Sequence, residues 1–115
     1  MQHSHEVLKE LGGQGRHLRE LIPDVYSAFL DLDRAAMVDG ALPTKTKQLI
    51  ALAIAVTLEC DGCIASHGRA AAREGATASE VAEVMGVAIM MNGGPGTVWG
   101  PRALAAFEEF LDPST

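Results

Sequence analysis

Two cysteines and one histidine stand close together near the middle of this 115-residue chain. Cys60 and Cys63 are separated by two residues, and His67 follows four residues after Cys63. A Cys-x-x-Cys pair can close into a disulfide with little movement of the backbone. The thiolate is the nucleophilic form of cysteine, and a helix start lowers the pKa of a thiol through its unpaired backbone N–H groups. The spacing therefore indicates thiol redox chemistry.

His67 belongs to the same group if this segment is helical. A separation of four residues places Cys63 and His67 on one helix face. A neutral imidazole in that position can take up or deliver a proton during thiol chemistry. A lone histidine would be interpreted as a partly buried side chain bound to a backbone carbonyl. Because this one follows two cysteines in a chain with no others, we expect it to transfer protons.

Helices must position these three side chains. Residues 43–58 are apolar on nearly every face, which predicts a central helix, and residues 64–74 predict a second helix directly after the cysteines. If the two helices form an antiparallel hairpin, Gln48 lies near His67. Its amide could then hydrogen-bond to the imidazole or to a water. The alternative is an ordinary polar residue at the start of a helix.

The remaining signals predict helices at residues 5–11, from Pro23 to just before Gly40, at 81–92 and at 101–111. We expect Gly12-Gly13 to end the first of them, and Gly93-Gly94-Pro95-Gly96 to separate the last two. Thr77 and Glu80 have the spacing of a capping box. No stretch alternates apolar and polar residues as a half-buried strand does. We therefore expect an all-α fold and a single domain over residues 1–115.

The composition limits the classes of function. The formal net charge is −6, and the 9 Lys and Arg residues are scattered, which argues against a nucleic-acid partner. The N-terminus lacks the apolar region of a signal peptide. The longest apolar run, residues 49–58, is too short to span a membrane, which takes about 20 residues. We therefore expect a cytoplasmic protein, where reactive or metal-binding cysteines are commoner than structural disulfides.

The apolar residues also bear on assembly. A short chain with helices that are apolar almost all round has difficulty covering that surface alone. Large exposed apolar patches usually mark interfaces, so the sequence favours a homo-oligomer. The alternative is that the helices cover one another within one subunit.

The segment from Leu42 to Ala72, with Cys60-Asp-Gly-Cys63 and His67, resembles the carboxymuconolactone decarboxylase family, in its AhpD-like alkylhydroperoxidase branch. Gly93-Gly-Pro-Gly with Trp99-Gly-Pro is similar to the loop before the final helix of that family. The decarboxylase branch generally lacks the Cys-x-x-Cys pair, so the resemblance implies the redox branch. It also implies an AhpD-like helical bundle whose central hairpin carries the two cysteines.

The resemblance implies a role for each side chain. Cys63 matches the peroxidatic cysteine, whose thiolate attacks a peroxide and becomes a sulfenic acid, and Cys60 matches the resolving cysteine, which forms a disulfide with it. His67 matches the histidine of the proton relay. The implied partners are a peroxide substrate, a dithiol reductant of lipoyl or thioredoxin type, and further copies of the chain in a trimer or hexamer. We expect no bound cofactor and no metal.

Two positions depart from the family's pattern. The family commonly has glutamate where Gln48 stands, and the hydroperoxidase type has histidine where Gly62 stands. A glutamine cannot act as a base, although it can orient His67 or a water. Gly62 removes one member of the relay. Both departures weaken the deprotonation of Cys63, so we expect peroxidase activity to be low.

Two other classes of function fit the same residues. Cys60, Cys63 and His67 could supply three ligands to zinc. The other histidines, His3, His5 and His17, lie in an N-terminal part that we expect to be mobile, which leaves a fourth ligand unassigned. The second alternative is a non-redox member of the family, either a lactone or carboxylate enzyme or a scaffold, in which the cysteines are incidental.

Overall fold

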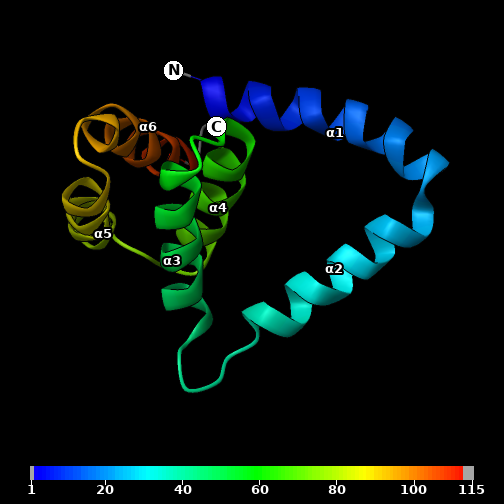
Figure 1. The fold of residues 1–115 in the computed structure, drawn as a ribbon, viewed down its shortest axis with the longest axis horizontal. Helices are drawn as coiled ribbons and strands as arrows, with labels where there is room; N and C mark the ends of the chain where they lie inside the picture. Colours follow the sequence, from blue (N-terminus) through cyan, green and yellow to red (C-terminus); the bar gives the residue numbers. More distant parts are fainter. Residues whose placement is uncertain (1, 113–115) are drawn as a thin grey trace.

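The computed structural model describes residues 2–112, which form helices joined by short turns and contain no strand (Figure 1). The helices are α1 (His3–Leu21), α2 (Pro23–Met37), α3 (Thr44–Thr57), α4 (Asp61–Arg73), α5 (Ala78–Asn92) and α6 (Gly94–Leu111). The predicted all-α fold is confirmed. None of these helices is long and apolar enough to cross a membrane.

Helices α3 to α6 form a bundle around one apolar core. Its four largest fully buried side chains come one from each helix: Leu52, Ile64, Val81 and Phe107. Helix α4 packs against both α3 and α6, and α5 packs against α3 and α6. Glycine permits the closest of these approaches. A Cβ on Gly68 of α4 would lie 3.3 Å from the backbone nitrogen of Phe107 in α6. The bundle therefore holds α4, the helix of the Cys-x-x-Cys pair, between α3 and α6.

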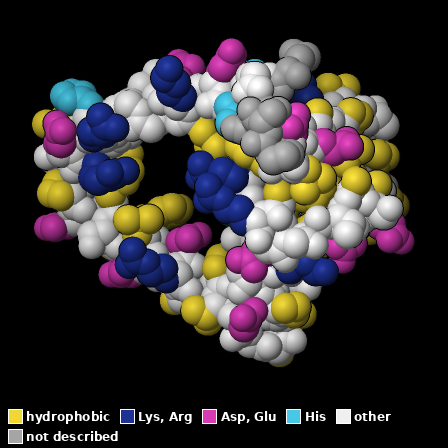
Figure 2. Space-filling model, turned by 180° about the vertical axis from the view of Figure 1, so that it is seen from behind, with side chains coloured by type: hydrophobic (Ala, Val, Ile, Leu, Met, Phe, Trp, Pro, Cys, Tyr) yellow, Lys and Arg dark blue, Asp and Glu magenta, His cyan; other side chains and the backbone are white. Residues whose placement is uncertain are grey.

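Helices α1 and α2 form an arm that extends from this bundle as an open V (Figure 1). Only the first part of α1 packs on the bundle, against α4 and α6, and none of the residues of α2 is buried. Figure 2 shows an opening between the arm and the bundle. The arm is therefore held mainly at its two ends.

The prediction for the first helix is wrong in length. Helix α1 continues through Gly12 and Gly13 and ends only at Leu21. A glycine inside a helix costs about 1 kcal/mol relative to alanine, which weakens a helix without ending it. Neither glycine has the positive φ that marks a helix stop.

The prediction for the last helix is also wrong. Helix α6 begins at Gly94, with a proline in its first turn, and it contains Pro101, where we expected it to start. Gly93 alone makes the turn from α5, with φ of 71°. Pro95 fits the first turn because the N–H groups there have no partner within the helix. The predicted capping box of α5 is confirmed: the Glu80 amide donates to Thr77 Oγ1 at 3.1 Å, and the Thr77 amide donates to Glu80 Oε1 at 2.9 Å.

Candidate active site

The turn between α3 and α4 sets the position of both cysteines. The Glu59 amide donates to the Val56 carbonyl and the Cys60 amide to the Ala55 carbonyl, both at 3.1 Å. These two bonds form a Schellman motif. In this motif, the residue directly after the helix C-cap takes the left-handed conformation. Here that residue is Glu59, with φ of 54°. The motif reverses the chain within a few residues, so α4 begins directly at the end of α3.

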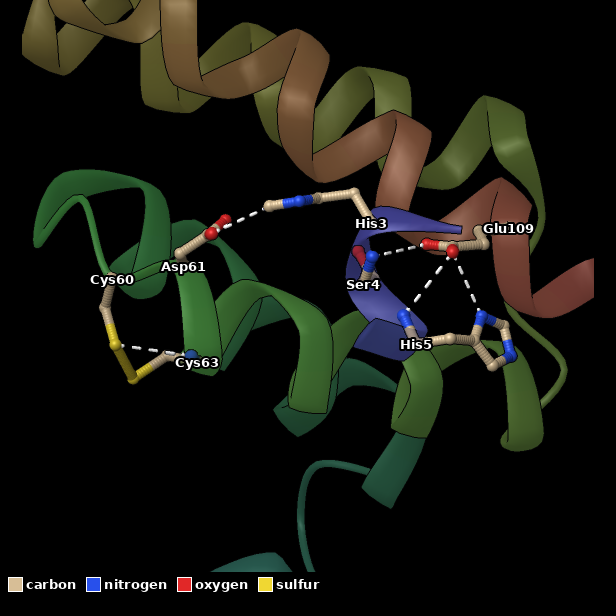
Figure 3. A network of polar contacts seen from close by, with 7 residues as sticks. All are labelled: His3, Ser4, His5, Cys60, Asp61, Cys63 and Glu109. Carbon is tan, nitrogen blue, oxygen red and sulfur yellow. Dashed lines mark hydrogen bonds and ion pairs between the residues drawn. A yellow bond between two sulfur atoms is a disulfide. The ribbon is translucent and has the colours of Figure 1, made fainter. Parts of the chain in front are cut away.

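Cys60 is the N-cap of α4, and its side chain serves as the cap. Its Sγ accepts a hydrogen bond from the Cys63 amide at 3.2 Å, and the two cysteines form a disulfide (Figure 3). Their Cα atoms are 5.2 Å apart. Both side chains are half-buried, and Cys63 packs against the apolar core. The predicted pairing of these two residues at a helix start is therefore present.

His67 lies on α4 one turn after Cys63 and contacts α3. Its Nδ1 is 2.8 Å from Oε1 of Gln48. Because an amide oxygen only accepts, Nδ1 carries the proton and Nε2 keeps its lone pair. Within residues 2–112 no hydrogen bond to Nε2 is formed. The hairpin of α3 and α4 thus brings Gln48 to His67, a contact that the sequence left conditional on this hairpin.

The surroundings of His67 favour its neutral form. Burial lowers the pKa of His67 below its ordinary value, and the negative charge of Asp33 on α2 raises it by a smaller amount. Burial disfavours the charged imidazolium because the protein solvates it less well than water does. His67 is therefore a neutral imidazole at neutral pH, with one nitrogen free to accept a proton.

The arm covers the start of α4. A Cβ on Gly62 would lie 2.6 Å from Cδ1 of Leu11 on α1, so the leucine occupies the space where a side chain at position 62 would begin. A histidine there would have to displace Leu11. The sequence indicated the missing relay residue, but it did not indicate this apolar contact.

The N-terminus of α1 is tied to the bundle by polar contacts that the sequence analysis missed (Figure 3). His3 Nε2 lies 2.8 Å from Oδ2 of Asp61, the first residue of α4. Glu109 of α6 accepts hydrogen bonds from the amides of Ser4 and His5 and from His5 Nδ1, at 3.0, 3.4 and 3.0 Å. For His3 and His5, these contacts contradict our expectation that the N-terminal histidines are mobile. Both pairs join residues more than fifty positions apart, and no local pattern signals them.

The structure also bears on the zinc alternative. Across the described residues there is no group of three or more His, Cys, Asp or Glu side chains placed to hold a metal ion. His3 and His5 each face a carboxylate on another helix. The zinc alternative therefore gains no support from this arrangement.

These features together define a class: an all-helical protein with a disulfide-forming cysteine pair at the start of an inner helix and a neutral imidazole on that helix. Residues 23–109 match the carboxymuconolactone decarboxylase family. The chain belongs to that family.

The chain is also similar to proteins from several bacteria. An uncharacterized protein of Cupriavidus necator is 42% identical over 101 residues, which cover 88% of this chain and 89% of that protein. Uncharacterized protein 4 in the cox locus of Paracoccus denitrificans is 43% identical over 85 residues, covering 74% and 77%. The crystal structure of apo-lpg0406, a carboxymuconolactone decarboxylase family protein from Legionella pneumophila, superposes with a TM-score of 0.94 at 38% identity, over 97% of this chain and 100% of that one.

Proposed function

We propose that the protein is a thiol-dependent oxidoreductase of the AhpD-like branch, which reduces hydroperoxides or exchanges disulfides through Cys60 and Cys63. The observation that carries the proposal is the disulfide between these residues at the start of α4, with His67 one turn further along the same helix. A structural disulfide needs no imidazole beside it. In a redox pair, by contrast, an imidazole can take up and return the protons that the thiols lose and regain.

The two thiols are activated in different ways. His67 is the base for Cys63, because the two share a helix face and the Gln48 amide directs the lone pair to Nε2. Cys60 is activated by the backbone, because the Cys63 amide donates to its sulfur at 3.2 Å. Cys63 is thus suited to attack the substrate, and Cys60 to resolve the product.

The peroxidase reaction proceeds in three balanced steps. His67 takes the proton of the Cys63 thiol, and the thiolate attacks the terminal oxygen of the hydroperoxide. The O–O bond breaks, the alkoxide takes the proton from His67 and leaves as an alcohol, and Cys63 becomes a sulfenic acid. The Cys60 thiol then forms the S–S bond and water leaves. An external dithiol of lipoyl or thioredoxin type reduces the disulfide and is itself oxidised.

Disulfide exchange is the second candidate activity, and the contact between Leu11 and Gly62 favours it. Peroxide reduction benefits from a relay group at position 62, whose place Leu11 occupies. Disulfide exchange needs only an attacking thiolate and a leaving thiolate, both of which α4 supplies.

We also propose that the working unit is a homo-oligomer in the cytoplasm. Many large apolar side chains are exposed on the arm and on α5, including Phe29 at 63%, Leu32 at 64% and Met91 at 74%. A single chain leaves them in contact with water. Association of copies, as trimers or hexamers, removes this surface from water.

A thiol titration tests the proposal. The reduced protein is mixed with one equivalent of cumene hydroperoxide, and we expect both thiols to be lost while one equivalent of cumyl alcohol forms. Cys60→Ser should lose its single thiol, whereas Cys63→Ser should retain its thiol over the same period. If no thiol is lost but oxidised lipoamide is reduced, the exchange activity is the correct one. If neither reaction occurs, the non-redox alternative holds.

A further inference from the structure

A cavity lies away from the cysteines, where α1, α4 and α6 meet. It has a volume of about 330 Å³ and is lined by His5, Arg69, Arg73 and Phe110. None of these residues takes part in the thiol chemistry proposed above. In Figure 2, a group of Lys and Arg side chains borders the opening on the side of the bundle.

Arg69 and Arg73 are two like charges one helix turn apart, a pairing that destabilises an isolated helix. Within residues 2–112 neither guanidinium forms an ion pair with a carboxylate, although the chain carries 15 Asp and Glu residues. Arg69 is half-buried, and burial followed by the charge of Arg73 lowers the pKa of Arg69. Arg73 is exposed, and it lies on the same face of α4 as Arg69. No carboxylate in the described part of the chain offsets the repulsion between these two guanidinium groups.

The other two residues that line the cavity, His5 and Phe110, carry rings that contact each other. The rings of His5 and Phe110 lie against each other with centroids 4.2 Å apart. Glu109 fixes the position of His5, because Nδ1 of His5 contacts this carboxylate at 3.0 Å and the His5 amide donates to it. The carboxylate of Glu109 is thus engaged by Ser4 and His5, not by the two arginines. The cavity therefore combines two arginines with two aromatic rings.

We propose that this cavity binds a small organic anion, with its carboxylate between Arg69 and Arg73 and its apolar body against Phe110. The guanidinium group presents parallel N–H donors that match the two oxygens of a carboxylate. A ring or short alkyl chain covers the Phe110 face. The cavity, of about 330 Å³, has room for a molecule the size of benzoate. This site is independent of the thiol reaction and stands whether or not that reaction occurs.

Calorimetric titration with benzoate tests the proposal on the full chain at low ionic strength. Benzamide has the same shape without the charge and serves as the neutral probe. We expect saturable binding of benzoate, and binding of benzamide at least about tenfold weaker, because charge-assisted hydrogen bonds are lost. The double variant Arg69→Gln/Arg73→Gln should lose at least about tenfold in affinity for benzoate. Arg16→Gln, which removes a charge from α1 outside the cavity, should bind as the unchanged protein does.

Thermal unfolding and light scattering complete the test. Without ligand, the double variant should unfold at the same or a higher temperature, because it relieves the repulsion between the two arginines. Equal binding of benzamide, unchanged benzoate affinity in the double variant, or no binding of benzoate would overturn the proposal. A lower molecular mass of the double variant without benzoate binding would also overturn it, since the arginines would then pair with a carboxylate of a second copy.

Discussion

The amide of Gln48 determines which nitrogen of His67 can act as a base. A carboxylate in the same place would do more, because it would both accept the proton of Nδ1 and stabilise the imidazolium. Here the neutral amide only orients the ring, while burial lowers the pKa of His67. The imidazole is therefore available as a base at neutral pH but is a weaker one than it would be beside a glutamate.

Replacement of Gln48 by glutamate tests this account. We expect Gln48→Glu to raise the pKa of His67 by about 1 unit or more, because an opposite charge within hydrogen-bond distance favours the imidazolium. NMR titration of the imidazole protons measures this directly. Gln48→Leu is the matched control, which removes the hydrogen bond without adding a charge and should leave the pKa low. A pKa that does not move in the glutamate variant would show that the side chain at position 48 does not face His67 in solution.

The sequence predicted some of the contacts around these residues and missed others. The spacing of Cys60, Cys63 and His67 is local, and a local pattern reveals it. Gln48 required one assumption about tertiary structure, the hairpin, which is confirmed. The contact of Leu11 with Gly62 was beyond prediction, because it depends on the true length of α1 and on where that helix crosses α4.

Among the elements, α3 and α4 end in the same way with different residues. Gly75 ends α4 with φ of 83°, and its amide and that of Ala76 donate to Ala72 and Ala71. Glu59 takes the equivalent place after α3 with φ of 54°. A residue with a Cβ costs about 1 kcal/mol or more in this conformation. A glycine signal therefore marks the end of α4 in the sequence, whereas the equally tight turn before Cys60 carries no such signal.

The approach of α5 and α6 gives a prediction about stability. A Cβ on Gly96 would lie 2.8 Å from Cα of Ile89, whereas one on Gly86 would meet nothing within 4 Å. Gly96→Ala should therefore destabilise the protein by about 1–3 kcal/mol through overpacking against backbone. Gly86→Ala, in the exposed middle of α5, should stabilise it by about 0.5–1 kcal/mol. Urea unfolding measures both, and equal effects of the two substitutions would contradict the described helix contact.

Glycine and proline explain which elements were predicted well. The start of α2 at Pro23, the start of α3 directly after Pro43 and the capping box of α5 are local signals that the fold confirms. The predictions for α1 and α6 were wrong because we treated Gly12-Gly13 and Pro101 as ends of helices. Packing of the first turns of α1 on α4 and α6 outweighs the weak preference of glycine against a helix.

At the scale of the whole molecule, other helices cover the arm less than they cover the bundle. Val25, Phe29 and Leu32 recur at helical spacing on α2, and all three are more than half exposed, at 61%, 63% and 64%. An amphipathic helix normally covers such a stripe with another element. No helix within residues 2–112 covers it, which is the physical reason to expect association between copies.

One substitution on α2 tests this expectation. Phe29→Glu should lower the molecular mass in solution or weaken assembly at least tenfold, because it places a charge in the apolar contact. Ser27→Glu adds the same charge to the same helix off the stripe and should leave the mass unchanged. Light scattering coupled to size exclusion distinguishes these results. If both variants have the mass of the unchanged protein, the α2 stripe is not an interface.

Trapping of the oxidised cysteine tests the central claim most directly. The variants Cys60→Ser and Cys63→Ser each keep one thiol and cannot form the disulfide. After treatment with cumene hydroperoxide and dimedone, mass spectrometry locates any sulfenic acid. The account predicts a dimedone adduct on Cys63 in Cys60→Ser and little or none on Cys60 in Cys63→Ser. An adduct that forms mainly on Cys60, or on neither residue, would contradict the role of His67 as the base that activates Cys63.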